Sequence, residues 1–305
     1  MIIPNAALFA DVDFTTLDVI HEYVGFVGTF FSVGAIAFYF LLLRPALSSS
    51  SPALVVASRT AARIGIMGAL LRLLFNLMSA STAMTEKHLT LVDALLGKPG
   101  MIVEEVAAVI AIFAFAGAAF AAHDALAAWT IAGTATLVGA LHGLITTKLS
   151  GVVNPIHVFA ASMWIGTLFV LAVAGIWTML SGEMQETERS PAVAVIVNRF
   201  STIALWSAGV LVLSGVTTAY LHIRSYTAVF TSIYGQTLLV KLVVVAGVFY
   251  LGAYNNRRLK PQLGTDEATL RLHRTATYEI ALAAIVLIVT AVLVNLPAPA
   301  EQLAH

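Results

Sequence analysis

Residues 155–181 read PIHVFAASMWIGTLFVLAVAGIWTMLS and contain no Asp, Glu, Lys or Arg. A helix of roughly 20 apolar residues is long enough to cross the hydrocarbon core of a bilayer. Because that core holds no water to bond the backbone, apolar runs of this length cross it as helices. Seven further runs are comparably apolar, at residues 18–43, 61–82, 101–121, 127–147, 199–222, 234–256 and 272–296. The sequence therefore predicts an all-α, polytopic membrane protein with eight transmembrane helices.

The composition supports this class and argues against several others. Apolar residues make up 59% of the chain and charged residues 10%, against about 25% charged residues in a soluble domain. The net charge is zero and there is no basic stripe, so nucleic acid is not an expected partner. The absence of cysteine excludes disulfides, thiolate metal sites and iron–sulfur clusters. No phosphate-binding glycine loop, GxSxG or HExxH motif occurs, so we expect a transporter or metal-binding protein rather than an enzyme.

The short connections predict how the chain faces the membrane, because Lys and Arg in such loops favour the cytoplasm. The connections after the first, fifth and seventh runs hold Arg44, Arg59, Arg63, Arg189, Arg199, Arg257, Arg258, Lys260, Arg271 and Arg274. The opposite side holds only Lys87, Lys98, Lys148 and Arg224. With an even number of spans, both termini are then expected on the outer side.

A weak internal repeat suggests two halves. Residues 20–31, IHEYVGFVGTFF, resemble residues 156–169, IHVFAASMWIGTLF, with two residues inserted. Later landmarks recur at a comparable separation, since Arg59 and Arg199 each begin the following run. Two four-helix halves in the same orientation, at residues 1–150 and 151–305, are therefore a hypothesis, in the manner of parallel repeats in transporters.

Four histidines lie in or at the ends of different predicted helices, all on the outer half: His21, His142, His157 and His222. Ionisable groups at membrane depth usually face the bundle interior or a wet cavity. Imidazole is the commonest metal ligand of proteins, and imidazole with thioether suits copper in an oxidising compartment. We therefore expect some of these histidines to bind a metal, assisted by Met163 and Glu22, although any one of them could be an interfacial residue bonded to backbone.

Other charged residues fall inside the predicted helices. Arg72 lies near the middle of its helix and needs a partner, for which Glu104 or Glu105 on the next helix is expected. Lys241 and Glu279 lie two turns into the last two helices from opposite sides. We expect structural or charge-pairing roles for these residues. For Arg72, a clamp between helices is slightly favoured over a role in transport, and Lys241 could instead extend to the outer interface.

Several short motifs in residues 150–300 resemble the copper-resistance protein D (CopD) family. They are His157 with Trp164-Ile165-Gly166, Asn198-Arg199-Phe200-Ser201, Ser214-Gly215, Tyr234 to Lys241 (YGQTLLVK), Asn255 to Pro261 (NNRRLKP), and a final helix opening Leu272-His273-Arg274 and carrying Glu279. The resemblance implies an eight-helix protein of the bacterial inner membrane with periplasmic termini. It also implies copper import from the periplasm with a separate, small copper-binding partner of the CopC type.

Two other functions remain open at the level of the sequence. A pair among the four outer histidines could hold haem b axially, in an electron-transfer protein. Alternatively, the chain could be a structural or assembly subunit of a larger membrane complex, with no cofactor. Passage of copper would also have to contend with Arg72 and Lys241, because a cationic lining repels a metal cation.

Overall fold

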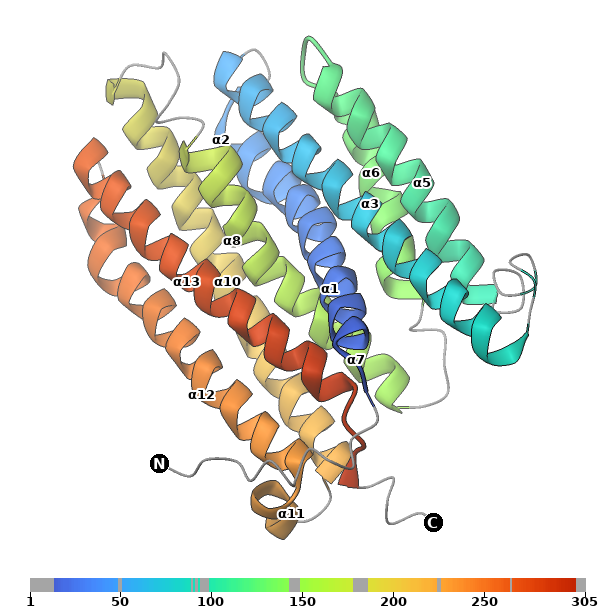
Figure 1. Cartoon of the computed structure of the whole chain (residues 1–305). Helices are drawn as coiled ribbons and strands as arrows, with labels where there is room; N and C mark the ends of the chain where they lie inside the picture. Colours follow the sequence, from blue (N-terminus) through green and yellow to red (C-terminus); the bar gives the residue numbers. More distant parts are fainter. Residues whose placement is uncertain are drawn as a thin grey trace.

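The computed structural model describes residues 14–48, 51–88, 90, 93, 99–142, 149–177, 186–223, 226–263 and 265–299. Within these ranges the chain is helical and contains no β-strand. Long helices run alternately in opposite directions, side by side in one bundle (Figure 1). The main helices are α1 (Thr16–Ala37), α3 (Pro52–Lys87), α5 (Pro99–Phe120), α6 (Leu126–Leu141), α7 (Leu149–Ala161), α10 (Glu186–Ile223), α12 (Ile233–Tyr254) and α13 (Asp266–Val294). Shorter segments between them are η2 (Phe38–Leu43), α2 (Arg44–Ala46), η4 (Ser162–Gly166), α8 (Thr167–Val170), η5 (Leu171–Trp177), α11 (Tyr226–Thr231), η6 (Asn255–Leu259) and η7 (Lys260–Gln262).

Seven helical stretches in the described residues are long and apolar enough to cross a membrane. They are Thr16–Ala46, Pro52–Thr85, Met101–Phe120, Gly151–Trp177, Pro191–Ile223, Ile233–Gln262 and Glu267–Val294. The remaining apolar helix, α6, has 16 residues, or about 24 Å at 1.5 Å per residue, against a hydrocarbon core of about 30 Å. The predicted spans 127–147 and 155–181 both end outside the described residues.

The stretch that decides the fold forms one helix with two π-helical turns. It begins as α7, passes through the π-helical η4, continues as α8, and ends in the π-helical η5. We call this continuous element helix 5. Turns of this kind occur mostly as local insertions in α-helices and often at functional sites. The 3.6-residue apolar pattern gives no sign of them, because both helix types satisfy the backbone in an apolar run.

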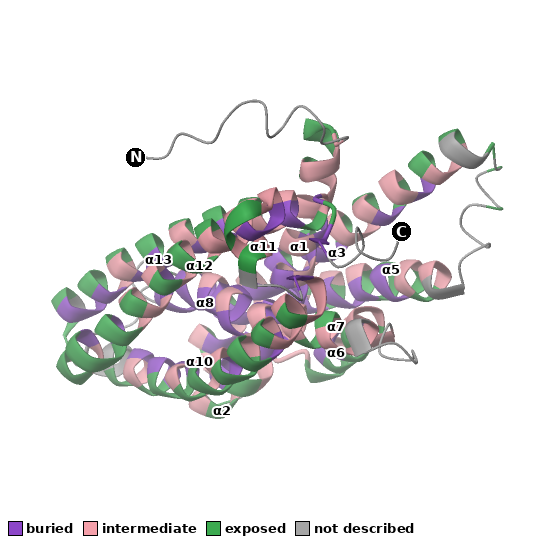
Figure 2. Ribbon diagram, turned by 90° about the horizontal axis from the view of Figure 1, so that it is seen from below, coloured by how far each residue is buried: buried purple, intermediate pink, exposed green. Residues whose placement is uncertain are grey.

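Apolar side chains lie on both the inside and the outside of the bundle. Figure 2 shows buried residues concentrated on α1 and α8 in the centre, with exposed residues on the outer faces of α10 and α12. The exposed residues include large apolar ones: Leu205, Trp206 and Leu213 on α10 and Val243 on α12 are each more than two-thirds exposed. An apolar exterior of this extent fits hydrocarbon as the surrounding solvent.

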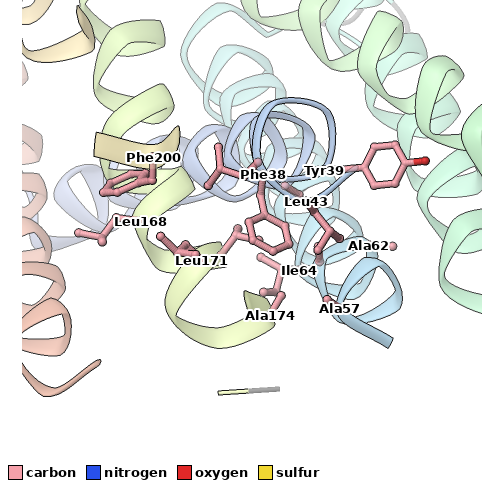
Figure 3. Close-up of a cluster of buried hydrophobic side chains, with 14 of the residues drawn as sticks. Phe38, Tyr39, Leu43, Ala57, Ala62, Ile64, Leu168, Leu171, Ala174 and Phe200 are labelled. Carbon is pink, nitrogen blue, oxygen red and sulfur yellow. The ribbon is translucent and has the colours of Figure 1, made fainter. Parts of the chain in front are cut away.

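The main core joins α1 and its extension η2 to α3, helix 5 and α10. Phe38 and Leu43 of η2 are fully buried and lie with Leu171 and Ala174 of η5. Figure 3 places Phe200 of α10 in the same cluster. At this end of the bundle the loop after α5 is tied to η2, because Tyr39 donates a hydrogen bond to Asp124 and Arg44 Nε lies 3.3 Å from the same carboxylate.

The closest helix contact is made by two glycines, Gly34 on α1 and Gly166 at the end of η4. A Cβ atom added to Gly166 would lie 2.2 Å from the backbone oxygen of Phe30, and one added to Gly34 would lie 2.3 Å from the backbone of Gly166. No side chain can give way at these positions, because the obstructing atoms belong to the main chain. The backbones of α1 and helix 5 are therefore in direct contact, as is typical of small residues at membrane helix interfaces.

We expect Gly166→Ala to lower stability by roughly 1–3 kcal/mol, because the added methyl forces α1 and helix 5 apart. Gly209→Ala is the matched control, since a Cβ at Gly209 meets nothing within 4 Å. In the middle of α10 this change should be neutral or stabilising by up to about 1 kcal/mol. Thermal unfolding of the purified variants in detergent compares the two, and equal midpoints would contradict the assigned contact.

Candidate functional site

A cavity of about 380 Å³ lies between α1, α3, α5, α6 and α7. Its lining residues come from the end of the bundle where α1 begins and α3 ends (Figure 1). Much of the wall is made of alanine and glycine, which leave the space open. Four titratable side chains also line it: Glu22, Arg72, Glu104 and His142. The cavity is therefore a mainly apolar chamber whose wall carries four titratable groups.

One carboxylate on the cavity wall lies between two nitrogen groups. Arg72 Nη2 donates a hydrogen bond to Glu104 Oε2, and His142 Nε2 lies 3.3 Å from Glu104 Oε1. Each of these side chains is about a fifth exposed. The sequence led us to expect Arg72 beside Glu104 or Glu105, and the contact is with Glu104. Glu105 lies outside this cluster, and its Oε1 is buried with no hydrogen-bond partner among the described residues.

The hydrogen bonds of His142 fix which ring nitrogen faces the cavity carboxylate. Nδ1 lies 3.0 Å from the backbone oxygen of Gly139, which can only accept, so Nδ1 carries the hydrogen. In a neutral ring, Nε2 then presents its lone pair to Glu104. A backbone carbonyl that orients an imidazole in this way is typical of metal-binding histidines.

His21 repeats this arrangement on the other side of the cavity. Its Nε2 lies 3.1 Å from the backbone oxygen of Phe75 and 2.9 Å from Ser79 Oγ, so Nε2 carries the hydrogen. Its ring stacks on Phe75 with centroids 4.2 Å apart. The other nitrogen, Nδ1, lies 3.8 Å from Glu22 Oε1. Glu22 lines the cavity but His21 is not among the lining residues, so this second imidazole–carboxylate pair adjoins the cavity only through its carboxylate.

The other two predicted histidines belong to the second half of the chain. His157 Nδ1 lies 3.0 Å from Ser214 Oγ, and the ring is close enough to Lys241 to interact electrostatically with it. His222 Nδ1 lies 2.8 Å from the backbone oxygen of Thr218. Neither histidine lines the cavity.

The structure does not gather all the predicted ligands at one point. Met163 is half-buried in η4, and none of the described contacts joins it to a histidine. Glu279 lies elsewhere, bonded to Asn255. Within the described ranges, no three His, Asp or Glu side chains form a group able to hold a metal ion. The candidate ligands are instead arranged as pairs.

Two serines pair with histidines; the sequence analysis did not name Ser79, and it named Ser214 only as part of a family motif. Ser79 on α3 contacts His21, and Ser214 on α10 contacts His157. The two histidines are 136 residues apart and the two serines 135 residues apart. A serine in an apolar helix gives little signal by itself, because its hydroxyl can bond the preceding turn. Only the repeated His–Ser separation could have identified these pairs.

The apolar helices, the exposed apolar exterior and the charged chamber define a multi-pass helical membrane protein. Residues 194–293 match the family described as Copper resistance protein D, so the chain carries a CopD-family region in its C-terminal half. The match covers α12, nearly all of α13 and most of α10.

A curated relative supports the same assignment. The chain is 34% identical over 146 residues to a protein of Bacillus subtilis (strain 168) named "Copper transport protein CutJ". The matched stretch is 48% of this chain but 25% of the relative, so the chain corresponds to about a quarter of that protein's length. No solved structure matches the chain.

We expect Arg72→Met to destabilise the fold by about 1–3 kcal/mol, because it removes the hydrogen-bonded partner of the partly buried Glu104 carboxylate. Glu104→Gln should also destabilise, since Arg72 then lacks a counter-charge. The double variant should cost less than the sum of the two single changes, because no unpaired charge remains. Denaturation of the wild type, the two single variants and the double variant completes a double-mutant cycle. Strictly additive losses of stability would show that the two side chains are not coupled.

Proposed function

We propose that the chain binds copper in the cavity and carries it across the bacterial inner membrane, inward from the periplasm. The observation that carries the proposal is the cavity with two imidazole–carboxylate pairs at its wall: His142 and Glu104 both line it, and Glu22, which lies beside His21, lines it as well. The CopD-family region and the copper transport protein among the relatives support copper as the cargo.

The arrangement in pairs suits a cargo ion better than a resident one. A conducting site must bind well enough to admit an ion and weakly enough to release it. Two ligands on each wall provide such weak positions, and imidazole nitrogens suit copper in a chain without thiolates. His157, His222 and Met163 remain candidates for later positions along the path.

Arg72 has a specific place in this proposal. It is the fixed cation that neutralises Glu104 while the chamber holds no copper. A copper ion at Glu104 and His142 would compete with the guanidinium for the carboxylate. This competition answers part of the objection that a cationic lining repels copper, because the positive charge is already paired.

The proposal includes a topology. Eight spans, with α6 as the fourth, would place both termini in the periplasm and the cavity at the outer face. The halves 1–150 and 151–305 would then be parallel repeats, each with a His–Ser pair between its first two helices. A small CopC-like periplasmic protein would deliver copper to the outer opening, and the chain could also belong to a larger membrane complex.

The chain contains no cysteine, so single cysteines test the topology directly. We expect a membrane-impermeant maleimide to label Thr90→Cys in intact spheroplasts, because Thr90 is exposed beyond the outer end of α3. Gln262→Cys, exposed in η7 at the opposite end, should react only after permeabilisation. The reverse pattern would invert the proposed orientation and place the cavity at the cytoplasmic face.

Copper binding tests the ligands. His142→Ala and His21→Ala should each weaken copper binding by at least about tenfold, since each removes an oriented imidazole. His273→Ala is the matched control, because that ring lies beside Trp177 and belongs to neither imidazole–carboxylate pair. Titration calorimetry of purified protein gives the affinities, and unchanged binding in both His142→Ala and His21→Ala would refute the assigned site.

The two alternatives give different results in the same preparation. A haem b protein would show a Soret band that is lost when a ligand among His21, His142, His157 and His222 is replaced by Ala, and no finding here favours that function. An assembly subunit would contain neither copper nor iron. Metal analysis and a visible spectrum of the wild type therefore separate the three functions.

A further inference from the structure

A second polar centre lies in the C-terminal half, away from the cavity. Glu279 on α13 is 2% exposed. Its Oε2 accepts a hydrogen bond from Asn255 Nδ2 at 3.1 Å, and the carboxyl also accepts one from the Trp164 side chain. Gly252 on α12 leaves room for the other oxygen, since a Cβ there would lie 3.3 Å from Oε1. One carboxyl group therefore joins helix 5, α12 and α13.

Both hydrogen-bond partners of Glu279 come from π-helical turns. Trp164 lies within η4, and Asn255 is the first residue of η6. Such turns change the direction of side chains relative to a regular α-helix and are frequent at functional sites. Two of them meeting at one buried carboxyl indicates a built site rather than a chance contact.

No opposite charge compensates Glu279 within the described residues. Its partners on helix 5 and η6 are neutral, and Arg257 and Arg258 of η6 are exposed. Lys241 on α12 is eleven residues from Gly252, or about 16 Å along the helix. After its first turn, α1 carries two acidic or basic side chains that lie next to each other: Glu22, which lines the cavity, and His21. Arg199 on α10 and Arg271 and Arg274 on α13 are exposed, and His273 on α13 lies beside Trp177. Helix 5 contains no charged residue. An ionised carboxylate here would be an uncompensated charge in a membrane-spanning bundle, which is costly.

Asn255 can serve both protonation states of the carboxyl. Its Nδ2 donates to the ionised form, and its Oδ1 is buried without a hydrogen-bond partner in the described structure. Turned over, the same amide presents Oδ1 as an acceptor for the O–H of a carboxylic acid. The residue is thus positioned to follow the gain or loss of one proton.

The chemistry of the site fits a proton and not a metal ion. Hard cations take about six oxygen ligands, whereas Glu279 is the only carboxylate at this position. The indole N–H of Trp164 is a donor only and would oppose a cation. A proton needs one oxygen with a free lone pair, and Oε1 against Gly252 provides it.

We propose that Glu279, with Asn255 and Trp164, forms a proton-binding site in the C-terminal half of the bundle. One proton binds the carboxylate to give the neutral acid and leaves it as the carboxylate forms again, with no other group changed. Buried carboxyls of this kind act as proton relays in pumps and transporters. If the proposed copper transport is correct, this site couples it to the proton gradient, but proton binding itself does not depend on that function.

Infrared spectroscopy of the purified full chain tests proton binding. The wild type should show the carbonyl stretch of a buried carboxylic acid near neutral pH, shifted on transfer to D₂O. Glu279→Gln should remove this band while keeping the hydrogen bonds from Asn255 and Trp164. Glu104→Gln is the matched control and should leave it unchanged, because Glu104 is paired with Arg72. The wild-type minus Glu279→Gln difference spectrum separates this band from that of any other protonated carboxyl, such as Glu105; a difference spectrum without a carboxylic-acid band overturns the site.

Asn255→Leu provides a second test that leaves the carboxyl in place. It removes the amide partner, so the frequency of the same band should change. An unaltered band would mean that Asn255 is not bonded to the protonated group and would overturn the arrangement. If Glu279→Gln fails to fold, Asn255→Leu still tests the proton site, because the frequency of the carboxylic-acid band is then compared between the wild type and Asn255→Leu.

Copper uptake into proteoliposomes separates the coupling from the proposed function. Wild-type uptake should rise with an imposed proton gradient, and Glu279→Gln should lose that dependence while binding copper as before. Wild-type uptake that ignores the gradient contradicts the coupling. No uptake under any gradient contradicts copper transport, and the infrared result still decides the proton site.

Discussion

The backbone contact between α1 and helix 5 is the constraint on which the rest of the bundle depends. Apolar helices gain little by leaving apolar lipid for one another, so their association relies on close packing. Gly34 and Gly166 allow main chain to touch main chain at the centre of the molecule. With these two helices fixed, α3 packs on one side of the pair and α10 on the other, which places one polar centre in each half.

Three carboxyl groups within the bundle, those of Glu104, Asp124 and Glu279, fall into two kinds by the charge of their hydrogen-bond partners. Glu104 is held by Arg72 and His142, and Asp124 is held by Tyr39 and Arg44. These carboxylates have cationic neighbours and can stay ionised. Glu279 is bonded only to neutral donors. The first kind fits recognition of cations or locking of helices, and the second fits exchange of a proton.

Much of the fold follows from the sequence, because a bilayer leaves an apolar run of residues such as 155–181 few alternatives to a helix. The pairing of Arg72 with a glutamate on the next helix could also be predicted from the sequence, since a buried arginine requires a carboxylate at its own depth on a neighbouring helix. The π-helical turns could not be predicted from the sequence. They change the apolar pattern of Ser162 to Gly166 too little to be distinguished from that of a regular α-helix. The spread of the histidines was equally hidden: equal depth along the helix axes does not say which way a ring points around each helix.

Helix 5 links the two polar centres physically. Asn154, Pro155, Val158 and Phe159 on its first part line the cavity. Trp164, two turns below His157, is bonded to the carboxyl of Glu279. Between these contacts lies the start of η4, where one helix type gives way to another. The same helix therefore contacts the carboxyl of Glu279 through η4 and lines the cavity through its earlier turns, and Gly166 fixes it against α1. A change at Glu279 that moved Trp164 would be passed along this helix toward the cavity wall, which is the route that the proposed coupling requires.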